Sequence, residues 1–356
     1  MNYIDRLVTK RILSRITLVI LVIFGLICLT ESLDTWRFKT LSDTQGQEIA
    51  ILAIVANAAR WSIKTLPVTV LIGAIIALLD LQSHRELIII KASGVSIWKI
   101  IRLPVISIAL IAFFISVFLD SKVTQINRSI MPSLQVTTQA VGDKRQVWLK
   151  QYSNDLEYVI EGEKLGSSVY ELKNLSIFLP PKSKYSLIEA KTAVLSLGEW
   201  KLKNVNLYTP SQPKLKVQNY SISTSSTRAE LELRLASSED FTFFELQKAL
   251  ALGIDDPVAK AAAATRLAKL MALPALLVGV LLIAFAFTSK FKRTGSYTSV
   301  ILTGVFLGFV VFVINEMADR AGSSGVLDPL FAAWGPAIVA IVIGVTILLF
   351  IEDGVA

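Results

Sequence analysis

The sequence has little of what catalytic sites are usually built from. One cysteine, Cys28, allows no internal disulfide, and with the single histidine, His84, it cannot form a His/Cys metal site. No segment matches the phosphate-binding loop G-x-x-x-x-G-K-[ST], a dinucleotide-binding glycine motif or the G-x-S-x-G turn of hydrolases. We therefore expect no catalytic residues, no metal and no cofactor in this chain. Work against a gradient would need energy from a partner.

Charged residues are also scarce, at 18% of the chain against about 25% in average globular proteins. Charge-free runs cover 270–289, 294–315 and 329–351, each close to the roughly 20 residues that cross a bilayer as a helix. Shorter charge-free runs lie at 16–30, 65–79 and 103–119, and a helix there can cross the bilayer only if it extends into the charged residues on either side. We expect the first helix to run from about Arg11 to Trp36 and the second to start near Trp61. Six spans exclude a soluble enzyme and a secreted disulfide scaffold.

Lysine and arginine indicate the orientation of these spans. Residues 1–15 and the links after the second and fourth spans are rich in basic residues, whereas 31–49 and 315–328 are richer in acids. Basic residues favour the cytoplasmic side. We therefore expect a multi-pass protein with both termini in the cytoplasm and its middle outside. The net charge of +8 is then explained by the orientation of the chain in the membrane, and we expect no nucleic-acid partner.

The polar middle of the chain shows a different period. Apolar and polar residues alternate, with Gly, Pro, Asn and Ser between the segments, which is typical of an antiparallel β-sandwich or jelly roll. A helical pattern follows over 241–252, and Asp256 before Pro257 predicts the N-cap of the next helix. The predicted strands are Gln146–Gln151, Leu156–Lys164, Leu172–Leu179, Leu187–Leu197, Trp200–Tyr208, Leu215–Ser223 and Ala229–Leu235.

The predicted fold class is therefore membrane α plus β, with six transmembrane helices in a 3+3 arrangement and an inserted β-jellyroll-like domain on the outer side of the membrane. The expected domains are 1–120, which holds spans one to three and a short cytoplasmic helix near 83–96; 121–262, which holds the β domain and its connecting helices; and 263–356, which holds spans four to six.

The short cytoplasmic helix carries an acid, Glu86, and an apolar stripe of Leu87 and Ile90, and it would end at Gly94, where a missing Cβ suits a left-handed residue. From the residues alone, two interpretations are equally good. The helix rests on lipid headgroups, or it fits a groove of another protein.

The motif Arg85-Glu86-Leu87, followed by Lys91-Ala92-Ser93-Gly94-Val95-Ser96, resembles the signature of the lipopolysaccharide-export permeases, the LptF/LptG family. The resemblance extends over the whole chain, as three spans, a periplasmic β-jellyroll and three spans. It implies that this link is a coupling helix seated in a groove of a cytoplasmic ATPase dimer. Glu86 would meet an arginine of the ATPase, and Arg85, Leu87 and Ile90 would surround that contact.

Two further details are more similar to the LptG branch than to the LptF branch. They are the acid and base Asp34 and Arg37 at the end of the first span, and Gly308-Phe309-Val310 in the fifth span. Glu31 departs from the lysine that LptG-type sequences often have there.

Charges near the outer ends of the spans have two interpretations. In the first, the charges simply lie at helix ends that emerge into water. In the second, they line a lumen that meets the phosphates and sugars of lipopolysaccharide, and Arg and Lys are suited to binding phosphate. For Asp80 and Asp120, snorkelling to the membrane interface is the more economical account. The lumen candidates are Asp34, Arg37, Lys39, Arg60, Lys64 and Arg128.

Gly304 and Gly308 form a G-x-x-x-G motif in the fifth span, a pattern that lets two helices approach closely. In the resembled family, spans one and five form the lateral gates. The resemblance therefore implies that these glycines permit close, separable packing at a gate.

Three functions are to be compared with these features. The first is a permease subunit of an ABC transporter that extracts lipopolysaccharide from the inner membrane and passes it to a periplasmic bridge during outer-membrane biogenesis. The implied partners are a related six-span LptF-like permease, a dimeric LptB-like ATPase that uses the ATP, LptC/LptA-like bridge proteins and lipopolysaccharide itself. The second is a non-transporting scaffold that relays ATP hydrolysis to a periplasmic event. The third, an intramembrane enzyme, lacks a polar cluster at mid-membrane depth.

Overall fold

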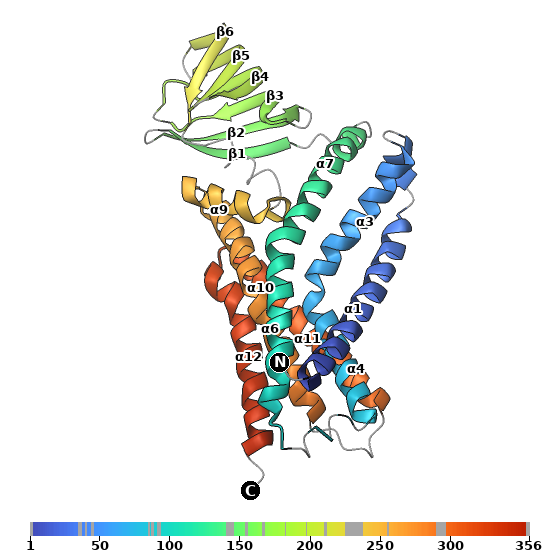
Figure 1. Cartoon of the computed structure of the whole chain (residues 1–356). Helices are drawn as coiled ribbons and strands as arrows, with labels where there is room; N and C mark the ends of the chain where they lie inside the picture. Colours follow the sequence, from blue (N-terminus) through green and yellow to red (C-terminus); the bar gives the residue numbers. More distant parts are fainter. Residues whose placement is uncertain are drawn as a thin grey trace.

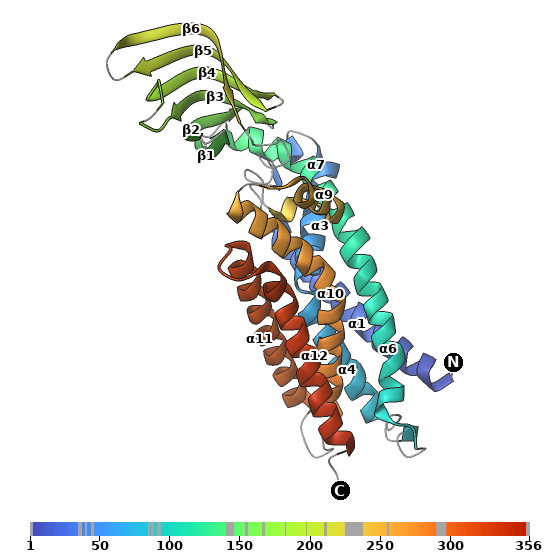
Figure 2. The ribbon, with the colours of Figure 1, turned by 90° about the vertical axis from the view of Figure 1, so that its left-hand side faces the viewer.

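Long helices form a bundle, and a β-sheet lies at one end of it (Figure 1). The same arrangement is seen after a quarter turn, with the sheet again beyond one end of the bundle (Figure 2). This computed structural model describes residues 3–34, 38–39, 41–43, 46–84, 86, 89–90, 94–139, 146–153, 156–165, 168–181, 183–196, 198–209, 212–224, 238–254, 256–289 and 297–353.

Six helices are long and apolar enough to cross a membrane, three before the sheet and three after it. This confirms the predicted number and grouping of spans. The helices that contain them are α1 (Tyr3–Ser32), α4 (Leu66–Ser83), α6 (Ile97–Phe114), which continues into α7 (Asp120–Gln139), α10 (Pro257–Ser289), α11 (Tyr297–Ser323) and α12 (Pro329–Asp353).

The second span begins later than predicted. A separate helix, α3 (Gln47–Lys64), precedes it, and only Thr65 stands between α3 and α4, which has Pro67 in its first turn. Proline has no N–H and its ring clashes with the preceding turn, so the chain changes direction here. The expected start near Trp61 was wrong. Arg60 and Lys64 consequently belong to the last turns of α3 and not to the span itself.

The third span is part of a longer helical rod. A five-residue π-helical segment, Ile115–Leu119, joins α6 to α7 without a break. The hydroxyl of Ser116 in this segment is buried and donates a hydrogen bond to the backbone carbonyl of Leu270 on α10. Single π-helical turns are often found at functional sites. The rod leads from the bundle towards the sheet (Figure 1).

Two helices form the centre of the bundle. Within their most apolar segments, 67% of the residues of α4 and 72% of those of α10 are buried, against 11% for α1 and 17% for α11. Glycine permits the close packing of α10 on α12, because a Cβ at Gly279 would lie 2.8 Å from that of Ala340, and one at Gly344 would lie 2.6 Å from that of Leu282. The outer helices leave wide apolar faces, which suits lipid or partner helices.

The inserted β domain is confirmed as a sheet of six antiparallel strands. Each strand pairs with the next one in the chain, so the order is that of a meander, β1-β2-β3-β4-β5-β6. Alternate residues face an apolar core that includes Trp200 and Tyr158, both essentially unexposed. The strands are β1 (Gln146–Ser153), β2 (Leu156–Leu165), β3 (Ser168–Phe178), β4 (Leu187–Ser196), β5 (Glu199–Thr209) and β6 (Gln212–Ser223). The predicted strand Ala229–Leu235 lies outside the described residues.

Two short elements return the chain from the sheet to the bundle. A single 3-10 turn, η2 (Ser238–Asp240), precedes α9 (Phe243–Leu252), whose N-cap Thr242 forms a reciprocal capping box with Glu245. The predicted N-cap of α10 is confirmed, because the side chain of Asp256 accepts a hydrogen bond of 2.9 Å from the backbone N–H of Val258. These caps fix the directions in which α9 and α10 start.

Candidate functional site

Charged side chains gather at both ends of the buried helix α4. At the end nearer the sheet, Arg60 and Lys64 of α3 meet the two acids of η2. The guanidinium of Arg60 lies 2.6 Å from a carboxylate oxygen of Asp240, and the ammonium of Lys64 donates a hydrogen bond to Glu239. The lumen candidates Arg60 and Lys64 are therefore brought together, but their charges are paired with acids.

The acid Glu239 remains ionised in this setting. Burial alone raises the pKa of Glu239, but the hydrogen bond from Lys64 and the charges of Lys64, Arg60 and Arg266 outweigh it and hold the pKa below its ordinary value. A lowered carboxyl pKa means that the interaction is fully formed at neutral pH and is lost only as the pH falls below the ordinary range. At physiological pH, η2 is thus tied electrostatically to α3.

Two further ion pairs connect the helices beside this point. Arg266 of α10 contacts both carboxylate oxygens of Asp120 on α7, at 2.8 and 3.0 Å, and the two side chains are only 11% and 5% exposed. Lys269 of α10 lies 2.7 Å from Asp319 of α11. The expectation that Asp120 snorkels to the interface was wrong, because a buried guanidinium neutralises it inside the bundle. We call Arg60, Lys64, Asp120, Glu239, Asp240, Arg266, Lys269 and Asp319 the sheet-side charge cluster.

A small cavity adjoins this cluster between α3, α4, α10, α11 and α12. Its charged lining consists of three cations, Lys64, Arg266 and Lys269, and Asn315 adds an amide, while the remaining lining is apolar. The acids that pair with these cations, Glu239, Asp120 and Asp319, do not line the cavity themselves, but they neutralise its three positive charges. An anion such as a phosphate would have to replace one of these acids as the partner of a cation.

The sequence did not reveal the contribution of α10 to this site. Arg266 and Lys269 stand three residues apart, at the border between the alanine-rich start of α10 and its charge-free run. That spacing places both on one face of a helix. This pair of cations on one helix face, at the start of an apolar span, was the feature of the sequence from which the contribution of α10 could have been predicted.

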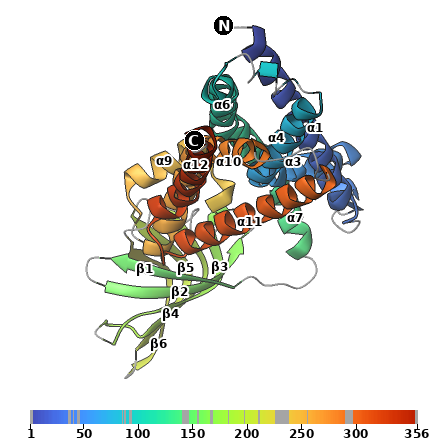
Figure 3. The same ribbon diagram turned by 90° about the horizontal axis from the view of Figure 1, so that it is seen from below.

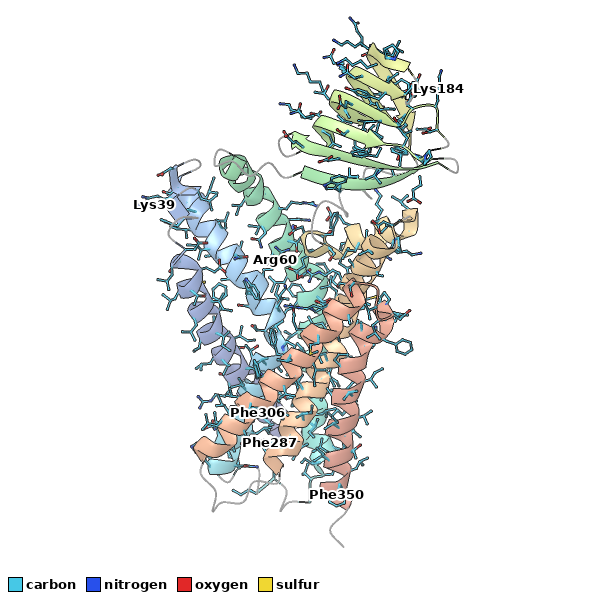
Figure 4. The ribbon with its side chains drawn as sticks, turned by 180° about the vertical axis from the view of Figure 1, so that it is seen from behind. Lys39, Arg60, Lys184, Phe287, Phe306 and Phe350 are labelled. Carbon is cyan, nitrogen blue, oxygen red and sulfur yellow. The ribbon has the colours of Figure 1, made fainter. Side chains whose placement is uncertain are left out.

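The other lumen candidates are dispersed. Lys39 is exposed near the tip of the α1–α3 hairpin, whereas Arg60 lies farther down, near the bundle (Figure 4). Asp34 is exposed and lines a narrow hollow with Glu31 and Phe38. Arg37 lies outside the described residues. The structure therefore does not gather the predicted lumen residues at one point.

Arg128 of α7 pairs with α9 and not with the sheet-side charge cluster. Its guanidinium donates two hydrogen bonds, of 2.7 and 3.3 Å, to the carboxylate of Glu245. Burial raises the pKa of Glu245, but Arg128 and the capping residue Thr242 lower it by more, and the pKa lies below its ordinary value. Both side chains are more than a third exposed, so the pair contributes about 0–1 kcal/mol.

At the other end of α4, a second group of charges joins α1 to the segment after α4. Arg11 lies 3.0 Å from Glu86 and 3.3 Å from Asp80, and Arg15 lies 3.1 Å from the same oxygen of Asp80. Asp80, like Asp120, is therefore paired instead of snorkelling. The second carboxylate oxygen of Glu86 is buried and has no hydrogen-bond partner among the described residues. Such an oxygen retains capacity for another donor.

The neighbours of Glu86 are arranged differently from the expected groove contact. Ile90 is 9% exposed and packs in the core of the bundle, while Ile89 is 66% exposed. Ile89, and not Ile90, is therefore the residue that faces outwards here. Arg85 and Leu87 lie outside the described residues. Gly94 has the left-handed φ of +79° that its position at the end of the motif predicts.

The G-x-x-x-G motif of α11 packs inside the chain. A Cβ at Gly304 would lie 2.6 Å from the end of Ile75, and one at Gly308 would lie 3.1 Å from Val68. Both neighbours belong to α4. Close approach of helices is thus the role of these glycines, as the motif predicts, and the helix approached is the buried α4 of the same chain.

These features define the class of the protein. The chain is a multi-pass membrane protein with three spans, an inserted β-sheet and three more spans. Among the described residues, no group of three or more His, Cys, Asp or Glu side chains could hold a metal ion.

The family follows from one comparison. The model of the lipopolysaccharide export system permease LptF/LptG matches residues 6–350, nearly the whole chain. The protein belongs to this family, and the resemblance carried by the segment around Glu86 is confirmed. The match does not distinguish LptG from LptF, so the preference for LptG stays a prediction. A comparison with curated proteins finds no match.

Proposed function

We propose that this chain is a permease subunit of an ABC transporter that extracts lipopolysaccharide from the inner membrane and passes it to a periplasmic bridge. It would pair with a related LptF-like permease and be driven by a dimeric LptB-like ATPase on the cytoplasmic side. LptC/LptA-like bridge proteins would receive the lipid from the β domain. The family match supports the substrate class, and the arrangement of α4 supports the way in which motion is transmitted.

The observation that carries the proposal is that α4 joins the two groups of charges. This α-helix has 18 residues, which gives it a length of about 27 Å at 1.5 Å per residue. Asp80 at one end is tied to Arg11 and Arg15, and Arg11 also holds Glu86. The other end follows directly on Lys64, which is tied to η2 and so to the return from the sheet. A buried, close-packed helix transmits displacement because the core around it is nearly incompressible.

In this proposal Glu86 is the contact with the ATPase. Its carboxylate is already held by Arg11, and 30% of the Glu86 side chain is exposed, so part of it is open to a donor such as an arginine of the ATPase. Ile89 supplies exposed apolar surface beside it. ATP-driven closure of the ATPase would then move Glu86 and α4 together. The chain contributes no nucleotide-binding motif of its own.

The substrate would meet two surfaces. At the sheet-side cavity, the phosphates of the lipid would compete with the acids Glu239, Asp120 and Asp319 for the lining cations Lys64, Arg266 and Lys269. The apolar face of the sheet suits its acyl chains. This face is partly open at the edge strand β6, where Leu215 is 57% exposed although it pairs with the buried Leu207 of β5.

Photo-crosslinking at β6 tests the proposal. A photoreactive residue at position 215 is expected to form lipopolysaccharide adducts that increase with ATP, in membranes that contain the chain and its co-purifying partners. Adjacent residues of a strand point to opposite faces, so position 216, occupied by the exposed Lys216, is the matched control and should give few adducts. Adducts at neither position, with or without ATP, would instead support a non-transporting relay.

A further inference from the structure

A cavity of about 640 Å³ lies beside the first turns of α1, at the end of the bundle opposite the sheet. The residues that line it include four cations of α1 and one acid of α4. Seen along the bundle from that end, the start of α1 extends beyond the other helices (Figure 3). The cations are Arg6, Lys10, Arg11 and Arg15, and the acid is Asp80.

The charges around this cavity are unbalanced. Asp80 and Glu86 together pair with Arg11 and Arg15. Arg6 and Lys10 are exposed, and no acid within the described part of the chain forms an ion pair with either. The cavity therefore keeps an excess of two positive charges. An anion with oxygen acceptors is the ligand that such a wall attracts.

The surface next to the cavity identifies what kind of anion fits. The face of α1 that carries Arg11 and Ser14 continues at helical spacing through Leu18, Val22 and Leu29, which are 52%, 54% and 64% exposed. A charged hollow thus leads into a long uncovered apolar stripe on the same helix. A free phosphate would use only the first of these features, whereas an amphiphile uses both.

We propose that this cavity binds the phosphodiester headgroup of an anionic membrane phospholipid, whose acyl chains lie along the apolar stripe of α1. Basic hollows between transmembrane helices are suited to such headgroups. Arg6 and Lys10 make the main contacts because their charges are not compensated. The site does not depend on the proposed export function, since it requires only that α1 crosses a membrane.

A lipid bound at this site would affect Glu86, because the two share Arg11. Arg11 lines the cavity and also holds Glu86. A phosphate in the cavity competes with the two carboxylates for Arg11 and Arg15, so the bound lipid adjusts how firmly Glu86 is held. The lipid composition of the membrane is in this way connected to the segment after α4.

Native mass spectrometry of the full chain with its co-purifying partners tests this site. We expect phosphatidylglycerol or cardiolipin to remain bound in preference to phosphatidylcholine. About 1 kcal/mol for each cation near an anionic lipid surface corresponds to about a fivefold change in affinity. The double variant Arg6→Gln/Lys10→Gln should therefore lower retention of the anionic lipid by well over fivefold.

The control is the double variant Lys99→Gln/Arg102→Gln. It removes the same charge from exposed residues at the start of α6, which do not line the cavity, and it should retain the lipid. Equal losses in both double variants, equal retention of phosphatidylcholine, or full displacement of the lipid by soluble glycerol phosphate would overturn the proposal. Loss of the ATPase from the Arg6/Lys10 variant with the lipid still bound would assign the cavity to a protein contact instead.

Discussion

Replacing Arg266 by methionine is expected to destabilise the protein by about 3–5 kcal/mol, the usual cost of removing one partner from a buried ion pair. The substitution leaves the carboxylate of Asp120, which is 5% exposed, without a counter-charge. It also removes the ion pair that connects α7 to α10 near the end of the bundle that faces the sheet. The measurement is the midpoint of thermal unfolding of the purified protein in one detergent.

Two companion variants separate burial from charge. The double variant Asp120→Leu/Arg266→Met removes both charges, and its stability should lie close to that of the wild-type protein, because apolar replacement of a whole buried pair is often neutral. Arg128→Met removes one partner of the exposed pair with Glu245 and should cost no more than about 1 kcal/mol. Equal losses for Arg266→Met and Arg128→Met would contradict the buried pair.

The second large effect is expected for Glu86→Ala. The variant should insert and assemble normally and should still support ATP hydrolysis, but lipopolysaccharide export should fall by about 5- to 150-fold. This range corresponds to the loss of a coupling free energy of about 1–3 kcal/mol. The cause is that nucleotide-driven motion of the ATPase no longer moves the segment after α4. Export and ATP hydrolysis are measured together in reconstituted vesicles.

Glu86→Gln and Lys99→Ala make this test specific. Glutamine keeps the shape of the side chain and an acceptor for Arg11 but removes the charge, so an intermediate loss of export would indicate that charge and position both contribute. Lys99→Ala removes an exposed charge from the same end of the bundle and should export normally. Normal export by Glu86→Ala at normal subunit levels would remove Glu86 from the coupling contact.

Local patterns in the sequence predicted the elements of the fold well. Charge-free runs located the spans, alternation located the six described strands, and Asp256 before Pro257 marked the start of α10. Each of these signals depends on neighbours within one element. The start of the second span was misplaced because hydropathy does not report a change of direction. Pro67 marked the break that ends α3 at Lys64.

Contacts between distant elements could not be predicted in the same way. Asp120 and Arg266 are 146 residues apart, and nothing in the sequence around either one identifies the other. The same holds for Arg60 with Asp240, since only the packing of η2 against α3 brings them together. The order of the strands and the inward position of Ile90 likewise follow from packing and not from periodicity.

The most direct test of the proposed function is ATP-driven release of lipopolysaccharide from proteoliposomes that contain this chain, its partner permease and the ATPase. Release to a soluble β-jellyroll acceptor should require all three proteins and hydrolysable ATP, and the isolated chain should hydrolyse no nucleotide. Nucleotide hydrolysis by the isolated chain, or release at the same rate when the chain is omitted, would contradict a permease driven by a separate ATPase.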